Sequence, residues 1–299
     1  MKVHVAVVQD VPVIFDKANT LDKVEALVKK YALEGTQLML FPESFIPAYP
    51  RGADFGAKVG RRTAEGRELY LRYWQESFEL GSDDQIRLER IARVSGVFLV
   101  IGVTERSSLH GSLFCSMLYI SPKQGLVGVH RKIKPTGTER LIWAEAGGDS
   151  LITVSSDWGR IGGLICWENY MPLARMVMYQ QGVQLYLAPT ADSREGWTAT
   201  MQHIALEGRC FVLAANQCVQ QEDYPEEYLN MVGSKEDLSC RGGSLIISPL
   251  GEILAGPLYG EKGCLTAEID LEDIIRAKLD FDPIGHYHRP DIFQFEIKS

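Results

Sequence analysis

Residues 162–172, GGLICWENYMP, carry a short run of small and apolar residues that ends at one cysteine. The run has the composition of a buried strand, and the residues that follow it have helical spacing. A cysteine at such a corner lies at the edge of a sheet, where backbone N–H groups of the next turn point toward its sulfur. The position suits a nucleophile, although the ordinary role of a single cysteine is that of a small buried apolar residue.

Strand and helix patterns alternate on both sides of this corner. Two hairpins are predicted as well, and both carry Ile-Ser-Pro followed by a glycine. This alternation predicts a mixed sheet covered by helices, and the many short apolar strands favour two such sheets packed face to face. The predicted strands span 3–9, 37–41, 98–105, 160–166, 183–189 and 210–217, the helices 16–35, 83–96, 170–182 and 196–209, and the hairpins 112–135 and 242–258.

The composition is that of a soluble globular protein, with 45% hydrophobic and 23% charged residues among 299. A net charge of −8 argues against nucleic acid or an anionic membrane as the main partner. No apolar run approaches the roughly 20 residues of a membrane helix. The N-terminal MKVHVAVVQD predicts a first strand and not a signal peptide.

The chain lacks a linker rich in Gly, Ser or Pro, so we expect one domain over 1–299 with a short C-terminal tail from about 285. The polar, acidic segment 220–239 is expected to form a surface excursion and not a domain boundary. Six scattered cysteines without a CxxC pair indicate reduced thiols in a cytoplasmic protein. His286 and His288 flank Tyr287, but no further Cys or His completes a cluster, so no metal is expected.

Two charged residues follow other predicted strands. Glu43 comes just after 37–41, and Lys132 ends the first hairpin. Taken alone, Glu43 would be interpreted as the cap of a helix or loop, and Lys132 as part of a solvated run of charged residues. Together with Cys166 they form a coherent set at three strand ends, because a carboxylate can take the thiol proton and an ammonium can stabilise an anionic adduct.

Five segments in this order resemble the nitrilase superfamily of carbon-nitrogen hydrolases, and more narrowly the true nitrilases. The resemblance extends from Phe41 to Phe293 and so covers nearly the whole chain. The matching segments are FPESFIPAYPRG (41–52), HRKIKPTGTERLIW (130–143), CWENYMPLARM (166–176), MQHIALEGRCFVLAANQ (201–217) and GHYHRPDIF (285–293).

The resemblance implies a role for each matching position. Cys166 resembles the catalytic nucleophile, Glu43 the general base, and Lys132 the residue that stabilises the tetrahedral species. Glu139 resembles a second glutamate that positions the lysine and the substrate, and the backbone N–H of Trp167 would lie near the reacting atom. The implied fold is a four-layer α-β-β-α sandwich of two mixed sheets flanked by helices, dimerised through helices.

The implied reaction converts a small-molecule nitrile into the carboxylic acid and ammonia through a thioimidate and a thioester on cysteine. It needs no metal and no organic cofactor. Aromatic pocket walls would suit aromatic, arylaliphatic and larger aliphatic nitriles. The residues expected to contact the substrate, each of which could equally be ordinary core, are Tyr49, Thr136, Trp143, Trp167, Tyr170 and Pro189.

Two other readings stay open at this point. An amidase or carbamoylase of the same superfamily would use the same Glu, Lys and Cys chemistry on an amide carbonyl. A non-catalytic binding or assembly protein would be favoured by a missing member of the triad, and none is missing. Only QFEIKS follows the RPDIF segment, and longer tails accompany filaments, so we expect a homodimer and leave higher assembly open.

Overall fold

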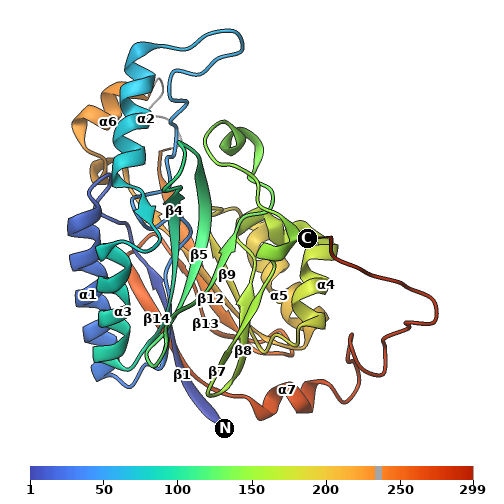
Figure 1. Ribbon diagram of the computed structural model, residues 1–299. Helices are drawn as coiled ribbons and strands as arrows, with labels where there is room; N and C mark the ends of the chain where they lie inside the picture. Colours follow the sequence, from blue (N-terminus) through green and yellow to red (C-terminus); the bar gives the residue numbers. More distant parts are fainter. Residues whose placement is uncertain (233–237, 299) are drawn as a thin grey trace.

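The computed structural model describes residues 1–232 and 238–298, in which two mixed sheets pack face to face (Figure 1). Each sheet has seven strands in this part of the chain, and helices cover its outer side. The layers therefore run helix, sheet, sheet, helix. The predicted four-layer α-β-β-α sandwich is confirmed.

The first sheet has the strand order β14–β1–β2–β4–β5–β6, with β3 beside β4. Its strands β1, β2 and β4 run parallel, whereas β4, β5 and β6 form an antiparallel meander and β14 runs antiparallel to β1. The predicted hairpin over 112–135 is the β5–β6 pair. The strands are β1 Lys2–Gln9, β2 Leu38–Leu40, β3 Phe78–Glu79, β4 Phe98–Arg106, β5 Leu113–Ser121, β6 Gly125–Arg131 and β14 Gly263–Asp270.

The second sheet has the order β11–β12–β10–β9–β8–β7, with β13 beside β12. Its central strands β8, β9 and β10 run parallel, and the predicted hairpin over 242–258 is the antiparallel β12–β13 pair. The strands are β7 Thr153–Ser156, β8 Gly159–Gly163, β9 Leu185–Thr190, β10 Phe211–Asn216, β11 Cys218–Val219, β12 Cys240–Ile247 and β13 Ile253–Tyr259.

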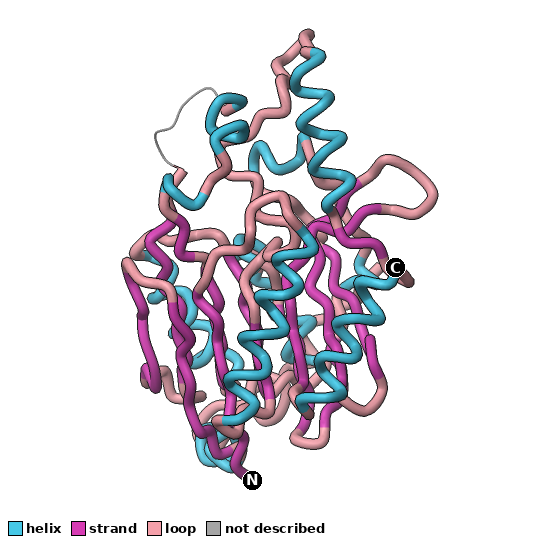
Figure 2. Tube along the Cα trace, turned by 90° about the vertical axis from the view of Figure 1, so that its left-hand side faces the viewer, coloured by secondary structure: helices cyan, strands magenta, loops and turns pink. Residues whose placement is uncertain are grey.

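Four helices cover the two sheets. Helices α1 (Lys17–Leu33) and α3 (Asp83–Ser95) lie side by side over the first sheet (Figure 2), and α4 (Pro172–Gln180) and α5 (Gly196–Gly208) cover the second. The apolar residues Leu21, Val24 and Val28 of α1 are buried against the first sheet. Separate apolar clusters lie under each helix pair, and a third fills the space between the sheets. The remaining α-helices of the described chain are α2 Ala64–Glu76, α6 Glu226–Met231 and α7 Glu272–Ala277.

The sequence pattern missed α2 and β14. Only Gly66, Leu69 and Tyr73 of α2 are buried, so its apolar stripe is too short to stand out. The strand β14 is an edge strand whose side chains are mostly half-exposed, and it lacks a continuous apolar run. The helix predicted over 170–182 begins only at Pro172, because a 3₁₀ turn, η3 (Cys166–Tyr170), precedes it.

The acidic segment 220–239 was predicted to form a surface excursion, but part of it is buried. It begins with a 3₁₀ turn, η4 (Gln221–Asp223), and continues into α6, and residues 233–237 of this prediction lie outside the described residues. Tyr224 and Tyr228 are buried and stack with ring centroids 5.1 Å apart. In the part of the chain that the structure covers, no helix combines the length and the hydrophobicity needed to cross a membrane.

One glycine just before the corner at Cys166 is required by close packing. A Cβ built on Gly163 would lie 1.8 Å from the carbonyl oxygen of Leu187 on the adjacent strand β9. We expect Gly163→Ala to lower the free energy of unfolding by about 3 kcal/mol, because the clash is with backbone that cannot move aside. Urea unfolding measures the loss. Gly196→Ala, where nothing lies within 4 Å, is the control and should change stability little; equal stability of both variants would contradict the close approach.

Candidate active site

Glu43, Lys132 and Cys166 come from three different strand ends and meet in the interior. Glu43 follows β2, Lys132 follows β6, and Cys166 follows β8 and begins η3. The Nζ atom of Lys132 donates to Oε1 of Glu43 at 2.7 Å and to Oε2 of Glu139 at 2.8 Å. The Lys132 and Glu43 side chains are fully buried. One buried ammonium is thus shared by two carboxylates.

Glu139, the second of these carboxylates, is fixed from two further sides. It lies in a 3₁₀ turn, η1 (Gly137–Leu141), and its Oε2 accepts from the backbone N–H of Thr136 at 2.6 Å. Its Oε1 accepts from the hydroxyl of Tyr49 at 2.8 Å. These hydrogen bonds fix the orientation of the Glu139 carboxylate, so that its Oε2 faces the Lys132 ammonium.

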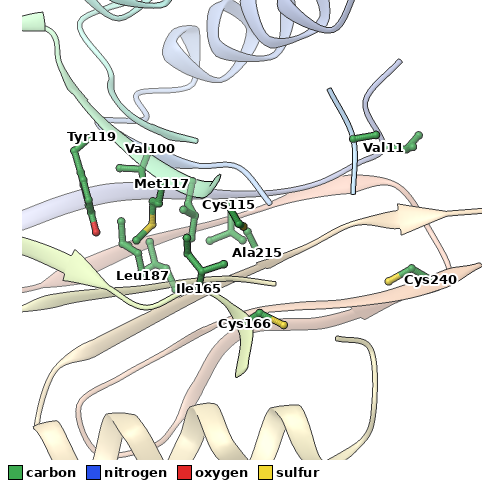
Figure 3. Close-up of a cluster of buried hydrophobic side chains, with 14 of the residues drawn as sticks. Val11, Val100, Cys115, Met117, Tyr119, Ile165, Cys166, Leu187, Ala215 and Cys240 are labelled. Atoms are coloured by element: carbon green, nitrogen blue, oxygen red, sulfur yellow. The ribbon is translucent and has the colours of Figure 1, made fainter. Parts of the chain in front are cut away.

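Cys166 has the unusual backbone conformation of a residue held at a sharp corner. Its φ of 51° lies in the left-handed region, which is costly for a residue with a Cβ. The Nδ2 atom of Asn169 donates to the carbonyl oxygens of both Leu164 and Cys166 and so stabilises the turn. Figure 3 shows Ile165 and Cys166 at the edge of the core between the sheets. This is the kind of strained strand-to-helix turn that presents a nucleophile.

Only one of the two oxygens of the Glu43 carboxylate accepts hydrogen bonds within the described residues. Its Oε1 receives Lys132 Nζ and, at 3.5 Å, the thiol of Cys115. Its Oε2 is buried and has no hydrogen-bond partner among the described residues. Buried polar atoms are rarely left unpaired, so this oxygen is suited to a proton that arrives during a reaction.

The charges of the cluster explain how it could work. Burial raises the pKa of Glu43, and the nearby Lys132 ammonium offsets part of that rise. Burial and then the Glu43 carboxylate raise the pKa of the Cys166 thiol, while Lys132 lowers it, and the net direction is upward. Burial lowers the pKa of Lys132, whereas the Glu43 and Glu139 carboxylates raise it, and the net direction is upward. The ion pairs of Lys132 with Glu43 and Glu139 thus lie near a thiol whose pKa is raised, so a base is needed to form the thiolate.

A cavity of about 310 Å³ opens onto Cys166. Of the residues expected to contact the substrate, Tyr49, Thr136 and Trp167 line it. The other three do not. Trp143 is buried, and its ring lies 5.7 Å from both Lys132 Nζ and the Tyr49 ring. Tyr170 is exposed and packs edge-on against Trp167. Pro189 is buried in β9. The remaining lining residues are Arg51, Glu139, Ala191, Asp192, Ser193 and Arg194.

The sequence interpretation missed residues 190–194, of which 191–194 line the cavity. The indole N–H of Trp167 donates to Asp192 Oδ2 at 2.8 Å, and Arg194 both pairs with Asp192 and lies over the Trp167 ring at 4.4 Å. These residues directly follow the strand predicted over 183–189. The criterion that selected Glu43 and Lys132, a polar residue at a strand end, would have found them.

Thr190 contacts the sulfur of Cys166. Its hydroxyl accepts from the backbone N–H of Asp192 at 3.0 Å and donates to Sγ at 3.2 Å. We expect Thr190→Val to lower kcat/KM about tenfold, because a hydrogen bond to a developing thiolate contributes about 1.5–3 kcal/mol. The rate of iodoacetamide alkylation should fall in parallel, and Thr190→Ser should restore both rates.

The matched control for this variant is Thr20→Val. Thr20 is also fully buried and hydrogen-bonded, but it lies in α1 and bonds to the backbone of Val13 and Asp16. The Thr20→Val variant should be less stable than the unaltered protein, but its rate of alkylation should be unchanged. An alkylation rate in Thr190→Val equal to that of the unaltered protein would contradict a role for this hydroxyl.

Among residues 1–232 and 238–298, no three His, Cys, Asp or Glu side chains are grouped so that they could hold a metal ion.

Comparison with known proteins gives a consistent result. The carbon-nitrogen hydrolase family matches residues 4–279. The chain is 46% identical to an aliphatic nitrilase of Sinorhizobium fredii, over 99% of this chain and 96% of the relative, and 42% identical to an arylacetonitrilase of Trametes versicolor, over 99% and 97%. A solved carbon-nitrogen hydrolase of Helicobacter pylori aligns over 98% of this chain and 97% of its own, with a TM-score of 0.77 and 19% identity. At 19% identity, the similarity to the Helicobacter pylori structure shows that the two proteins share a fold.

Proposed function

This protein belongs to the carbon-nitrogen hydrolase family, and we propose that it is a nitrilase that converts small organic nitriles into the carboxylic acid and ammonia. The observation that carries the proposal is the buried Lys132 ammonium held by Glu43 and Glu139 beside the Cys166 corner. Such an arrangement supplies a base, a nucleophile and a fixed positive charge in a water-excluded site.

The first half of the reaction forms a covalent adduct. Glu43 takes the proton of the Cys166 thiol as the sulfur attacks the nitrile carbon, and the C≡N bond becomes a C=N bond. Glu43 then passes that proton to the nitrile nitrogen, so the product is a thioimidate and Glu43 is again a carboxylate. The raised pKa of the thiol means that proton transfer and attack go together, and the hydrogen bond from Thr190 and the charge of Lys132 stabilise the negative charge on the sulfur.

The second half releases ammonia and then the acid. Glu43 takes a proton from a water molecule, which adds to the thioimidate carbon to give a tetrahedral adduct near Lys132. The C–N bond breaks, ammonia leaves, and a thioester remains on Cys166. A second water molecule, again activated by Glu43, cleaves the C–S bond to give the carboxylic acid and restore the thiol. Two water molecules are consumed for each nitrile.

The similarity to named nitrilases favours the nitrile over the amide as substrate. The triad by itself fits an amide carbonyl equally well, so an amidase or carbamoylase remains the alternative. Nitrilases of bacterial, plant and fungal origin are 42–47% identical to this chain over almost its full length. An arylacetonitrilase and an aliphatic nitrilase are both among them, which supports a substrate range over both classes.

Product analysis with matched pairs tests this function. An aliphatic nitrile and an arylacetonitrile are each compared with their own amide, and ammonia and the acid are quantified by mass spectrometry. We expect equal amounts of acid and ammonia from at least one nitrile, at a higher rate than from its amide. Hydrolysis of the amides without hydrolysis of either nitrile would assign the protein to the amidase branch.

We further propose a homodimer in a reducing compartment such as the cytoplasm. All six cysteines lie in the described part of the chain and are free. Large apolar side chains are exposed on the α4–α5 side, among them Leu173 at 67% and Leu206 at 42% of full exposure, which suits an interface through these helices. Light scattering should give twice the chain mass of 33.4 kDa, and a mass of 33.4 kDa would contradict the dimer.

A further inference from the structure

A second buried acid–base pair, which the mechanism above does not use, lies behind the catalytic cluster. The Nε2 atom of His130 is 2.9 Å from Oε2 of Glu168, and neither side chain has any exposed surface. Charged pairs are rarely buried so completely, because each ion loses its hydration. The hydrogen bonds that the two side chains make to the backbone compensate for the hydration they lose.

Glu168 contacts the backbone of both catalytic segments. Its Oε2 accepts from the N–H of Ile165, the residue before Cys166, at 2.8 Å. Its Oε1 accepts from the N–H of Ile133, the residue after Lys132, at 2.7 Å. One side chain thus joins the segment that carries the sulfur to the segment that carries the ammonium.

The hydrogen-bond partners of His130 decide its charge. Its Nδ1 lies 2.8 Å from the carbonyl oxygen of Ser150, which can only accept. Its Nε2 faces the carboxyl group of Glu168, whose two oxygens already accept from the backbone N–H groups of Ile133 and Ile165. Both ring nitrogens must therefore carry a proton, and His130 is an imidazolium.

We propose that the His130 imidazolium and the Glu168 carboxylate are a positioning pair that fixes the Cys166 and Lys132 segments relative to each other. Their contribution to turnover rests on the proposed function, whereas the charge state of His130 and its effect on thiol reactivity do not. Because geometry at the reacting atoms controls the rate steeply, a small shift of either segment should lower kcat without changing substrate affinity.

The surrounding charges set the pH at which the pair is lost. Burial lowers the pKa of His130, but the Glu168 carboxylate and the Ser150 carbonyl raise it more; Lys132 opposes them, and the net direction is upward. The other titratable groups that sense Glu168 are the phenols of Tyr119 and Tyr186, whose own pKa values burial raises, so they stay neutral. The pair is therefore intact below the ordinary histidine pKa and is lost as the pH rises through the higher folded value.

Nitrogen-15 NMR of the histidine rings tests the charge state in the unaltered protein. At about pH 6.5, the ordinary pKa of histidine, both nitrogens of His130 should show imidazolium shifts, because its pKa is raised above that value. His130→Gln assigns the signal among the six histidines. One unprotonated ring nitrogen at that pH would overturn the assignment, whatever the protein hydrolyses.

The variant Glu168→Gln tests the positioning role. Its single amide oxygen can face only one of the two N–H groups of Ile133 and Ile165, so one of the two catalytic segments loses its acceptor. We expect kcat to fall about a hundredfold with KM within about twofold, and alkylation of Cys166 by iodoacetamide to slow as well.

The control is Glu105→Gln. Glu105 is buried and also accepts three hydrogen bonds, but these come from the side chains of Ser116 and Arg131. It should lose stability while kcat and alkylation stay unchanged. If the folded fraction of Glu168→Gln keeps the alkylation rate of the unaltered protein, the positioning role is wrong. Failure of the proposed function would instead appear as no nitrile turnover by the unaltered protein.

Discussion

Cys166→Ala is expected to lower nitrile hydrolysis by at least about 10⁴-fold, because no covalent intermediate can form without the sulfur. Thr190 and Asn169 remain in place around the smaller side chain, so the fold should be retained. Ammonia release from an arylacetonitrile measures the loss, and circular dichroism checks the fold.

Cys218→Ala is the matched control for that variant. Cys218 is also buried, but it lies in β11, where it pairs with Arg241 of β12. Its replacement should leave ammonia release within about twofold of the unaltered protein. Equal activity of Cys166→Ala and Cys218→Ala would exclude Cys166 as the nucleophile.

Lys132→Met is expected to affect both stability and activity. It keeps most of the side-chain volume but leaves two buried carboxylates without their cation, which should lower the free energy of unfolding by about 3–5 kcal/mol. The loss of a fixed positive charge at the tetrahedral adduct should lower kcat by about 10²–10³-fold.

The stability of Lys132→Met should depend on pH in a definite direction. Burial raises the pKa of Glu43 in the folded state, and without Lys132 only the hydrogen bond from the Cys115 thiol still offsets that rise. A carboxyl group with a raised folded pKa binds its proton more readily when folded, so the destabilisation should diminish as the pH falls and grow as it rises. Urea unfolding at pH 5 and pH 8 measures the difference.

Lys123→Met provides the control for this pair of measurements. Lys123 lies in the turn of the same hairpin, but its ion pair with Asp157 is largely exposed. Exposed pairs contribute little, so stability should change by less than about 1 kcal/mol at either pH. A Lys132→Met variant that behaves like Lys123→Met would show that the two carboxylates do not depend on the ammonium.

The sequence allowed the strand ends to be placed, and with them the catalytic candidates. The β5–β6 hairpin and the strand over 183–189 had clear apolar patterns, and Lys132 and Cys166 follow strands that such patterns define. The fold itself was predicted as two packed sheets because short apolar strands alternated with helices. Local pattern was enough here, since central strands such as β9 and β10 are buried on both faces and therefore form continuous apolar runs.

The aromatic part of the cavity wall could not be predicted in the same way. Which of Trp143, Trp167 and Tyr170 faces the cavity depends on how loops from both sheets meet, and a motif does not fix that. The charge of His130 depends likewise on Ser150 and Glu168, which are distant in sequence and adjacent only after folding. The direction of the Cys166 pKa shift needed the extent of burial, which the sequence left open.

Mass spectrometry of the acid-quenched protein during turnover tests the central claim most directly. The protein is mixed with an arylacetonitrile, quenched within the first turnovers and measured intact, and the modified peptide is then mapped. We expect the mass of an acyl or imidoyl group on the peptide that contains Cys166, and no such mass in Cys166→Ala. Rapid turnover with unmodified protein at every quench time, or an adduct on another cysteine, would contradict covalent catalysis at Cys166.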